Sequence, residues 1–276
     1  MKRLDRAVQQ SSNLAPSLPN MYESLAARQV AIRRGEVTLI AGQPGAGKST
    51  LAMALANRAQ VPVLYFSADT HAHTQSMRLI AMLTDTDQAI VEQAMLDTAW
   101  AAEVLGQAGH IRWSFDSAPS VEAVESELDA HVELFSRAPE MVVIDNLTDM
   151  TGSNGDEWAG MRDLLKDFKY LAREYDCAFL VLHHTTEGVA GNPCPPRSAL
   201  MGKVAQTPAL ILTVAQDEAG FLGVCPVKSR YGPSSPSGSE PTWLRYLPAS
   251  MQVLEVDQEF NRAALGQWAE QSGVDF

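Results

Sequence analysis

Short apolar runs alternate along the chain with longer segments whose apolar residues recur at helical spacing. Runs rich in β-branched and aromatic residues, which predict buried strands, are found at 37–41, 61–66, 141–144 and 178–182. Segments with helical spacing lie between or beside these runs, at 49–56, 75–105, 120–139 and 158–171. Strands that alternate with helices predict an α/β fold in which helices cover both faces of a mostly parallel sheet.

Two further patterns complete the predicted sheet. Residues 111–115 alternate apolar and polar side chains, which predicts one more strand. After residue 209 the apolar segments at 209–215, 221–227 and 243–247 follow one another closely, which predicts an antiparallel C-terminal extension.

Length and composition allow one domain with a large core. The chain has 276 residues, of which 46% are hydrophobic and 20% are charged. Residues 1–30 are polar and contain two prolines, so we expect an N-terminal arm or linker there. One domain is expected at 31–256, followed by a C-terminal helical tail at 257–276.

Charge and cysteine content narrow the classes of protein. The formal net charge of −12 argues against a basic surface, so any contact with nucleic acid must come from a local cluster. The three cysteines are odd in number and lack CxxC spacing, which indicates neither a disulfide framework nor a zinc site and favours a reducing compartment. No apolar run approaches the ~18 residues of a membrane span. We therefore expect a soluble cytoplasmic protein without membrane contact.

A complete phosphate-binding motif lies between a predicted strand and a predicted helix. Its residues are Gly42-Gln43-Pro44-Gly45-Ala46-Gly47-Lys48-Ser49, which match GxxxxGK[ST]. Thr50 follows the motif in the predicted helix and is a further candidate for nucleotide binding. The glycines let backbone N–H groups surround phosphate oxygens, while Lys48 reaches the β- and γ-phosphates and Ser49 ligates Mg²⁺. The motif predicts nucleotide phosphate chemistry, with ATP and Mg²⁺ as the expected cofactors.

Two acidic residues follow predicted strands and are candidates for catalysis. Asp145 ends an apolar strand about a hundred residues after the motif, where an acid can hold the Mg²⁺ water shell; its alternative role is to end the strand in a turn. Asp69 follows the second strand and is the candidate base for the attacking water; its alternative role is to cap the helix that begins near Thr74. His71 and His73 lie beside Asp69 and are interpreted as surface histidines rather than metal ligands.

A histidine pair ends the strand at 178–182. We expect His184 to sense the γ-phosphate, although the pair could also be a satisfied strand end. Residues 186–206 contain three prolines and several glycines, which predicts a long loop. Arg197 and Lys203 are the cations of this loop, and on an otherwise acidic chain they are the candidates for contact with any nucleic acid.

Lys228 and Arg230 stand one residue apart at the end of a predicted strand, so their side chains share one face. Two cations on one face indicate an anionic partner. They could reach the γ-phosphate bound by an adjacent subunit, or they could protect an exposed strand edge from pairing.

Taken in order, these segments resemble a known family of motors. The phosphate-binding motif, Ser67-Ala68-Asp69-Thr70, Ile144-Asp145, Leu182-His183-His184-Thr185 and Lys228-Ser229-Arg230-Tyr231-Gly232-Pro233 are similar to the motor domain of the DnaB/RepA-type hexameric replicative helicases of superfamily 4. The resemblance covers about residues 20–255. The His-His-Thr form is closer to small plasmid helicases and related phage ATPases, which implies a bacterial host cytoplasm.

The resemblance implies a RecA-like ATPase that forms a homo-oligomeric ring of six subunits. It implies nucleotide sites between subunits, single-stranded DNA as the partner, and a primase or loader protein as a further partner. By position, Lys48, Ser49 and Thr50 would bind nucleotide and Mg²⁺, Asp145 would be the Walker B acid and Asp69 the catalytic acid. His184 would be the sensor, and Lys228 and Arg230 would act in the neighbouring site.

One departure from the family keeps alternatives open. The family usually has Glu at the position of Asp69, whose shorter side chain reaches less far toward a water. We expect an ATP-hydrolysing DNA motor, a replicative DNA helicase that acts as a ring. A RecA-like recombinase or recombination mediator, and a nucleotide-switched DNA-binding protein without unwinding activity, are the alternatives.

Overall fold

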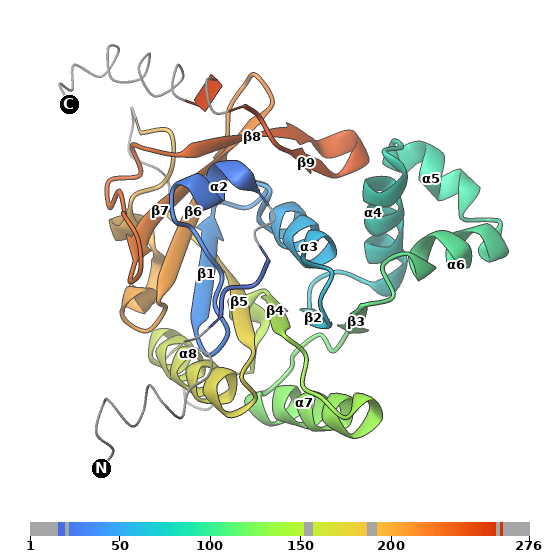
Figure 1. Ribbon diagram of the computed structural model, residues 1–276, viewed down its shortest axis with the longest axis horizontal. Helices are drawn as coiled ribbons and strands as arrows, with labels where there is room; N and C mark the ends of the chain where they lie inside the picture. Colours follow the sequence, from blue (N-terminus) through green and yellow to red (C-terminus); the bar gives the residue numbers. More distant parts are fainter. Residues whose placement is uncertain (1–15, 20–21, 152–156, 187–191, 258–259, 262–276) are drawn as a thin grey trace.

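The computed structural model describes residues 16–19, 22–151, 157–186, 192–257 and 260–261. These residues form one nine-stranded sheet with the strand order β3-β2-β4-β5-β1-β6-β7-β8-β9, and helices pack on both of its faces (Figure 1). The strands are β1 (Val37–Gly42), β2 (Val63–Ser67), β3 (Ile111–Ser114), β4 (Met141–Asp145), β5 (Ala178–His184), β6 (Leu210–Gln216), β7 (Phe221–Ser229), β8 (Thr242–Leu247) and β9 (Gln252–Leu254).

The sheet has a parallel core and an antiparallel extension. Strands β1 to β6 pair in parallel, whereas β6, β7, β8 and β9 pair antiparallel in sequence order. The predicted α/β fold class is therefore confirmed, including the change of pattern after residue 209. The short strand β9 was not predicted from the sequence because it has three residues, too few to show a period.

Helices form a layer on each face of the sheet. They are α2 (Glu23–Ala27), α3 (Lys48–Ala59), α4 (Ala72–Thr84), α5 (Gln88–Ala94), α6 (Thr98–Gly106), α7 (Val121–Phe135) and α8 (Glu157–Glu174), with 3₁₀ turns η1 (Leu147–Asp149), η2 (Arg197–Ala199), η3 (Met201–Gln206) and η4 (Pro248–Ser250). Figure 1 shows α7 and α8 together on one side, while α4, α5 and α6 project beyond the β3 edge.

Two buried clusters hold these layers to the sheet. Ile40 of β1 packs with α3 and α4, whereas its neighbour Leu39 packs with α7 and α8, because successive strand residues point to opposite faces. Strands that are buried on both faces read as continuous apolar runs, which explains why β1, β4 and β5 could be predicted from composition alone.

The segment predicted as helical at 75–105 forms three helices rather than one. Asp87 caps α5 by accepting a hydrogen bond from the backbone N–H of Ala89, and Asp97 caps α6 by accepting from Ala99 and Trp100. Each aspartate satisfies donors that a new helix leaves unpaired, so the chain restarts a helix at each one. Ser120 caps α7 as predicted, by accepting from Ala123.

The described part of the predicted N-terminal arm packs on the sheet domain. Tyr22 and Leu25 are buried, and the Tyr22 hydroxyl donates to the carbonyl of Val253 at 3.0 Å. Residues 1–15 and most of the predicted tail at 257–276 lie outside the described residues. The division into arm, domain and tail stays a prediction. Among the helices that the structure describes, none is long and apolar enough to cross a membrane.

Candidate active site

The residues singled out from separate parts of the sequence meet at one edge of the sheet. Strands β1, β2, β4 and β5 run parallel, so their carboxyl ends lie side by side. Gly42 pairs with His184, and Ser67 pairs with Asp145. Ligands of open α/β sheets bind at this carboxyl edge, where loops and helix N-termini face them.

The phosphate loop joins β1 to α3 and has the conformation that only glycine adopts readily. Gly45 and Gly47 have φ angles of 77° and 87°, in the left-handed region. A Cβ at Gly42 would lie 2.8 Å from the carbonyl oxygen of Val214, so the backbone approach there also requires glycine. Helix α3 begins directly after Gly47 and turns its positive N-terminal end toward the loop. The loop is therefore preformed for an anion.

Lys48 is held over this loop by the loop itself. Its side chain is buried, and Nζ donates to the carbonyls of Gly42 at 3.0 Å and Gln43 at 2.9 Å. Burial lowers the pKa of Lys48, while the carboxylates of Asp145 and Asp69 act in the opposite direction. A buried cation whose partners are neutral carbonyls is a favourable partner for phosphate oxygens.

Ser49 and Asp145 fit a magnesium ion. The Ser49 hydroxyl donates to Asp145 Oδ1 at 3.2 Å, and the Tyr65 hydroxyl donates to Oδ2 at 3.0 Å. Asp145 is 3% exposed, and burial raises its pKa to about 6, with the hydrogen bond from Ser49 opposing the rise. Oxygen ligands of this kind, beside a phosphate loop, are those that Mg²⁺ prefers.

Asp69 is exposed after the end of β2, close enough for its charge to act on Lys48, and it does not cap the next helix. Its carboxylate accepts from the Thr70 hydroxyl at 2.8 Å. Helix α4 begins at Ala72 and has His71 at its N-cap position, without a side-chain capping bond. The alternative role of Asp69 as a helix cap is therefore not the one that the structure has. His71 and His73 are exposed, and no group of three or more potential metal ligands forms in the part of the chain that the structure describes.

The two histidines after β5 have different surroundings. His184 is half-buried beside Gly42, and burial lowers its pKa, with Lys48 acting in the same direction. His183 is fully buried, and its Nε2 donates to the carbonyl of Met201 at 3.0 Å. The direct link from the edge of the sheet to the following loop is therefore made by His183, whereas His184 is the one placed beside the phosphate loop.

The described part of the loop after β5 is anchored near the site. The backbone N–H of Thr186 donates to the carbonyl of Ala199. Gly202 has a φ of 70°, and a Cβ added there would lie only 2.5 Å from the Trp158 ring, so the segment packs closely against Trp158. Arg197 and Lys203 are both exposed on this segment. The two cations that we expect to contact DNA thus belong to the same anchored segment and face solvent.

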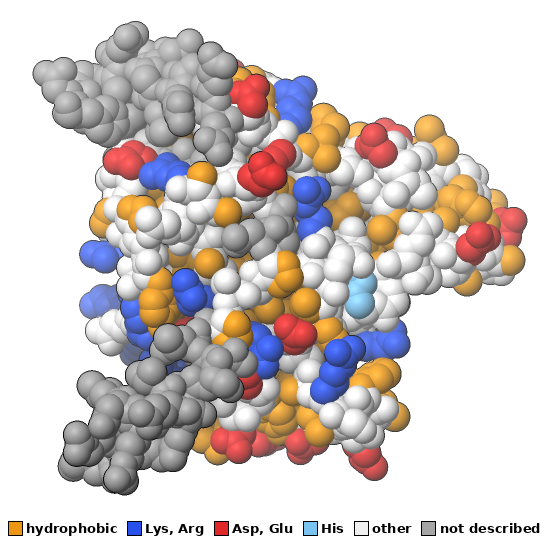
Figure 2. All heavy atoms as spheres, in the orientation of Figure 1, with side chains coloured by type: hydrophobic (Ala, Val, Ile, Leu, Met, Phe, Trp, Pro, Cys, Tyr) orange, Lys and Arg blue, Asp and Glu red, His pale blue; other side chains and the backbone are white. Residues whose placement is uncertain are grey.

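Lys228 and Arg230 lie at the opposite edge of the sheet. Leu210 starts β6 and pairs with Ser229, so the end of β7 lies where the parallel strands begin. Because β1 has six residues, the two edges are roughly 17 Å apart at ~3.3 Å per residue. Figure 2 shows Lys and Arg side chains gathering beside the lower ends of β6 and β7. Neither residue reaches the phosphate loop of its own chain.

These two cations are held differently. The Arg230 guanidinium donates to Glu36 Oε1 at 2.8 Å, and the Tyr231 hydroxyl donates to the same oxygen. Lys228 Nζ donates to three backbone carbonyls at 2.6 to 2.9 Å, those of residues 205, 206 and 208. Burial lowers the pKa of Lys228. Lys228 therefore fixes the end of the loop after β5, whereas the exposed Arg230 has an ionic partner, the buried Glu36.

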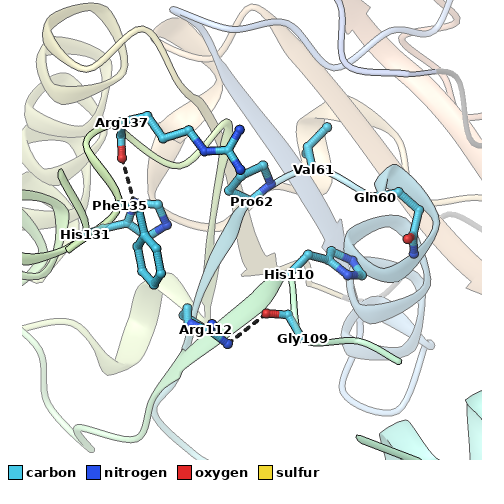
Figure 3. A pocket seen from close by; sticks show the side chains of 9 residues that line it. All are labelled: Gln60, Val61, Pro62, Gly109, His110, Arg112, His131, Phe135 and Arg137. Atoms are coloured by element: carbon cyan, nitrogen blue, oxygen red, sulfur yellow. Dashed lines mark hydrogen bonds between the residues drawn. The ribbon is translucent and has the colours of Figure 1, made fainter. Parts of the chain in front are cut away.

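A separate hollow of about 180 Å³ lies where β2 and β3 begin (Figure 3). Arg112 donates to the carbonyl of Gly109 and lies over the Phe135 ring, while His131 Nδ1 donates to the carbonyl of Arg137 at 2.8 Å. This hollow is at the end of the sheet opposite to the phosphate loop, so it is not part of the nucleotide site.

Sequence reasoning missed several side chains at the site. Tyr65 lies inside an apolar strand and reaches Asp145 only through the register of β2 with β4. Gln216 donates to the carbonyl of Gly45 at 2.7 Å, a contact that depends on β6 lying beside β1. Asp149 follows Asp145 by four residues, and burial raises its pKa. An acidic residue this soon after Asp145 was the feature of the sequence that could have identified it.

Comparisons with known proteins agree with this geometry. A family described as "AAA domain" matches residues 27–189. The chain is 32% identical to the Gene 65 protein of Mycobacterium phage L5 over 249 residues, which cover 86% of this chain and 92% of that protein.

Two solved structures share the fold. One is an ATPase domain that aligns with a TM-score of 0.77 at 18% identity, and the alignment covers 92% of this chain and 96% of that domain. The other is a DnaB-like replicative helicase, whose title also names its interactions with primase. It aligns with a TM-score of 0.76 at 17% identity, and the alignment covers 92% of this chain and 65% of that chain. The resemblance to DnaB-type motor domains and the RecA-like fold expected from the sequence are confirmed.

Proposed function

The chain belongs to the AAA domain family, and because it shares its fold with a DnaB-like replicative helicase, we propose that it is an ATP-hydrolysing motor that moves on single-stranded DNA as a replicative helicase. The observation that carries the proposed ATP hydrolysis is the convergence of Lys48, the Ser49–Asp145 pair and Asp69 at a preformed phosphate loop.

Each residue has a role that follows from its surroundings. The loop backbone and Lys48 bind the phosphates, and Ser49 with Asp145 holds Mg²⁺, which neutralises phosphate charge when bound. Asp69 accepts the proton of the attacking water because its carboxylate is exposed at the strand end and bonded only to Thr70 among the described residues. His184 lies beside Gly42 and senses the γ-phosphate, and His183 passes a shift of the strand end to the loop at Met201.

The site is completed by a second subunit in a ring of six. Arg230 lies roughly 17 Å from its own phosphate loop, a distance that one side chain does not span. In a ring, the edge that carries Arg230 faces the phosphate loop of the neighbour. The guanidinium then exchanges Glu36 for the γ-phosphate, while Lys228 supports the loop that carries Arg197 and Lys203 toward DNA.

The partners proposed here follow from the same arrangement. Arg197 and Lys203 contact phosphates of single-stranded DNA. One similar structure is titled for its interactions with primase, and a primase or loader protein is the further partner that we propose for this chain.

The test is ATP hydrolysis with and without single-stranded DNA. We expect DNA to stimulate turnover in the wild type, and Lys48→Ala to abolish turnover and strongly weaken nucleotide binding, because the variant removes the cation over the loop. Lys166→Ala removes an exposed lysine of α8 and is the matched control, with unchanged rates expected.

The alternatives have distinct outcomes in the same experiments. Tight ATP binding without turnover in the wild type would favour a nucleotide-switched DNA-binding protein. Formation of joint DNA molecules without unwinding would favour a recombinase or mediator. Wild-type turnover in Lys48→Ala would refute the assignment of the nucleotide site.

A further inference from the structure

The Asp145 carboxylate is held by a hydroxyl on each of its two oxygens. Ser49 donates to Oδ1 at 3.2 Å and Tyr65 donates to Oδ2 at 3.0 Å. We propose that Tyr65 is a positioning residue for the metal site, which fixes the plane of the Asp145 carboxylate so that Oδ1 stays turned toward Ser49. This inference rests on the proposed function, because it concerns the same nucleotide site.

Tyr65 can have this role because of its strand and register. It lies in β2 with its side chain fully buried, and it pairs with Val143 two residues before Asp145. A buried tyrosine hydroxyl requires a hydrogen-bond partner, and Asp145 is the partner it has among the described residues. A phenylalanine would satisfy the packing of this position equally well, so the hydroxyl is explained by the carboxylate that it reaches.

Two donors fix a carboxylate where one does not. The terminal torsion of an aspartate is broad, so a bond from Ser49 to one oxygen leaves the carboxylate free to rotate about it. A second donor on the other oxygen removes that freedom. Outer partners of metal ligands have this effect generally, and their loss costs about 10–100-fold in metal affinity or activity.

The Tyr65 ring is itself held by a row of aromatic rings. Trp113 of β3 stacks on Tyr65 with ring centroids 4.4 Å apart, and Phe115 stacks on Trp113 at 5.9 Å. Strand β3 is one of the two edge strands of the described sheet, and Phe115 follows its last residue and is exposed. The row fixes the ring, and the ring carries the hydroxyl to Asp145.

The test compares Tyr65→Phe with the wild type in binding a fluorescent ATP analogue at increasing Mg²⁺. Tyr65→Phe keeps the ring and its stacking and removes only the hydroxyl. In Tyr65→Phe we expect a rise of about tenfold in the Mg²⁺ concentration that gives the half-maximal change in analogue binding. The affinity for the analogue in EDTA should be unchanged. The ATPase rate at low Mg²⁺ should fall by a similar factor and recover in excess Mg²⁺. Tyr22→Phe is the matched control, because it also removes a buried hydroxyl bonded at 3.0 Å, and it should leave the Mg²⁺ requirement unchanged.

Several outcomes separate this inference from the proposed function. If Tyr65→Phe has the wild-type Mg²⁺ requirement, Tyr65 is a packing residue and the inference is wrong. If Tyr65→Phe does not fold, two variants of Trp113 replace it. Trp113→Phe retains a ring for stacking and should keep the wild-type Mg²⁺ requirement, whereas Trp113→Leu should raise it. Equal Mg²⁺ requirements in these two variants would overturn the inference. If the wild type binds the analogue with Mg²⁺ but hydrolyses no ATP, the proposed motor fails while the binding measurement still decides the role of Tyr65.

Discussion

Asp69 is the residue that we propose as the catalytic base, and the helicase family that the sequence resembles usually has Glu at its position. Its carboxylate accepts a hydrogen bond from the Thr70 hydroxyl and does not cap α4. A substitution of Asp69 therefore disturbs no helix cap. We expect Asp69→Asn to retain ATP binding and to lose roughly 10²-fold or more in turnover, as for removal of a general base. Steady-state ATPase rates and a nucleotide-binding titration measure both quantities.

The companion variant Asp69→Glu tests the length of the side chain. A gain in turnover would show that the shorter carboxylate limits the enzyme. If Asp69→Asn hydrolyses ATP at the wild-type rate, Asp69 is not the base.

Burial of the Asp145 carboxylate costs stability. Burial raises its pKa from 3.8 to about 6, so the folded protein binds this proton more tightly than the unfolded chain does. The contribution of this group to the free energy of unfolding is therefore fully present below pH 4. It is lost as the pH rises through about 6, which lowers the free energy of unfolding by up to about 3 kcal/mol. Asp145→Asn carries no charge and avoids this loss.

Asp145→Asn should therefore be catalytically inactive but at least as stable as the wild type at pH 8, with the difference shrinking as pH falls from 6 to 4. Denaturant unfolding without nucleotide or Mg²⁺ at a series of pH values measures this. A lower free energy of unfolding for Asp145→Asn at pH 8 would show that the hydrogen bonds of the carboxylate outweigh its burial.

Elements set by local signals could be predicted from the sequence, and contacts set by register could not. Strands β1, β4 and β5 are continuous apolar runs, and the phosphate loop carries its glycines in a fixed order, so their places follow from composition. The hydroxyl of Tyr65 and the ring of His183 instead acquire partners through strand register and a returning loop. A sequence period states which face a residue occupies but not which residue lies opposite.

The loop after β5 is the element that we assign to DNA. It returns to the sheet at Leu200 and presents Arg197 and Lys203 to solvent. The double variant Arg197→Ala/Lys203→Ala should bind single-stranded DNA more weakly and reduce the slope of log affinity against log salt by roughly 1.4, because two fewer phosphates are neutralised. Fluorescence anisotropy of a labelled oligonucleotide at several salt concentrations measures the slope.

The control for this loop is a double variant on another element. Lys166→Ala/Arg173→Ala removes two exposed cations of α8 and should leave the slope unchanged. An unaltered slope for Arg197→Ala/Lys203→Ala would remove the DNA assignment from this loop.

At the scale of the whole molecule, we propose that the two edges of the sheet carry complementary parts of an active site that neighbouring subunits share. The phosphate loop lies at the carboxyl edge, and Arg230 lies at the other edge in an ion pair with Glu36. Arg230→Ala should bind ATP normally and hydrolyse it 10³–10⁵-fold more slowly, as expected for loss of an arginine finger. Its intact Lys48 site and the Arg230 of a Lys48→Ala partner form one working interface, so mixing the two inactive variants should restore part of the turnover.

Assembly provides the second check of this arrangement. Analytical ultracentrifugation with an ATP analogue and single-stranded DNA should detect a hexamer as the active species. Full activity of Arg230→Ala, or an active monomer at every concentration, would contradict the assignment of Arg230 to the neighbouring site.

Movement along DNA is tested most directly by the displacement of streptavidin from single-stranded DNA that carries biotin at one end or the other. We expect ATP to accelerate displacement from one of the two ends, with no acceleration in Lys48→Ala and none with a non-hydrolysable analogue. DNA-stimulated ATP hydrolysis that accelerates displacement from neither end would contradict the motor function.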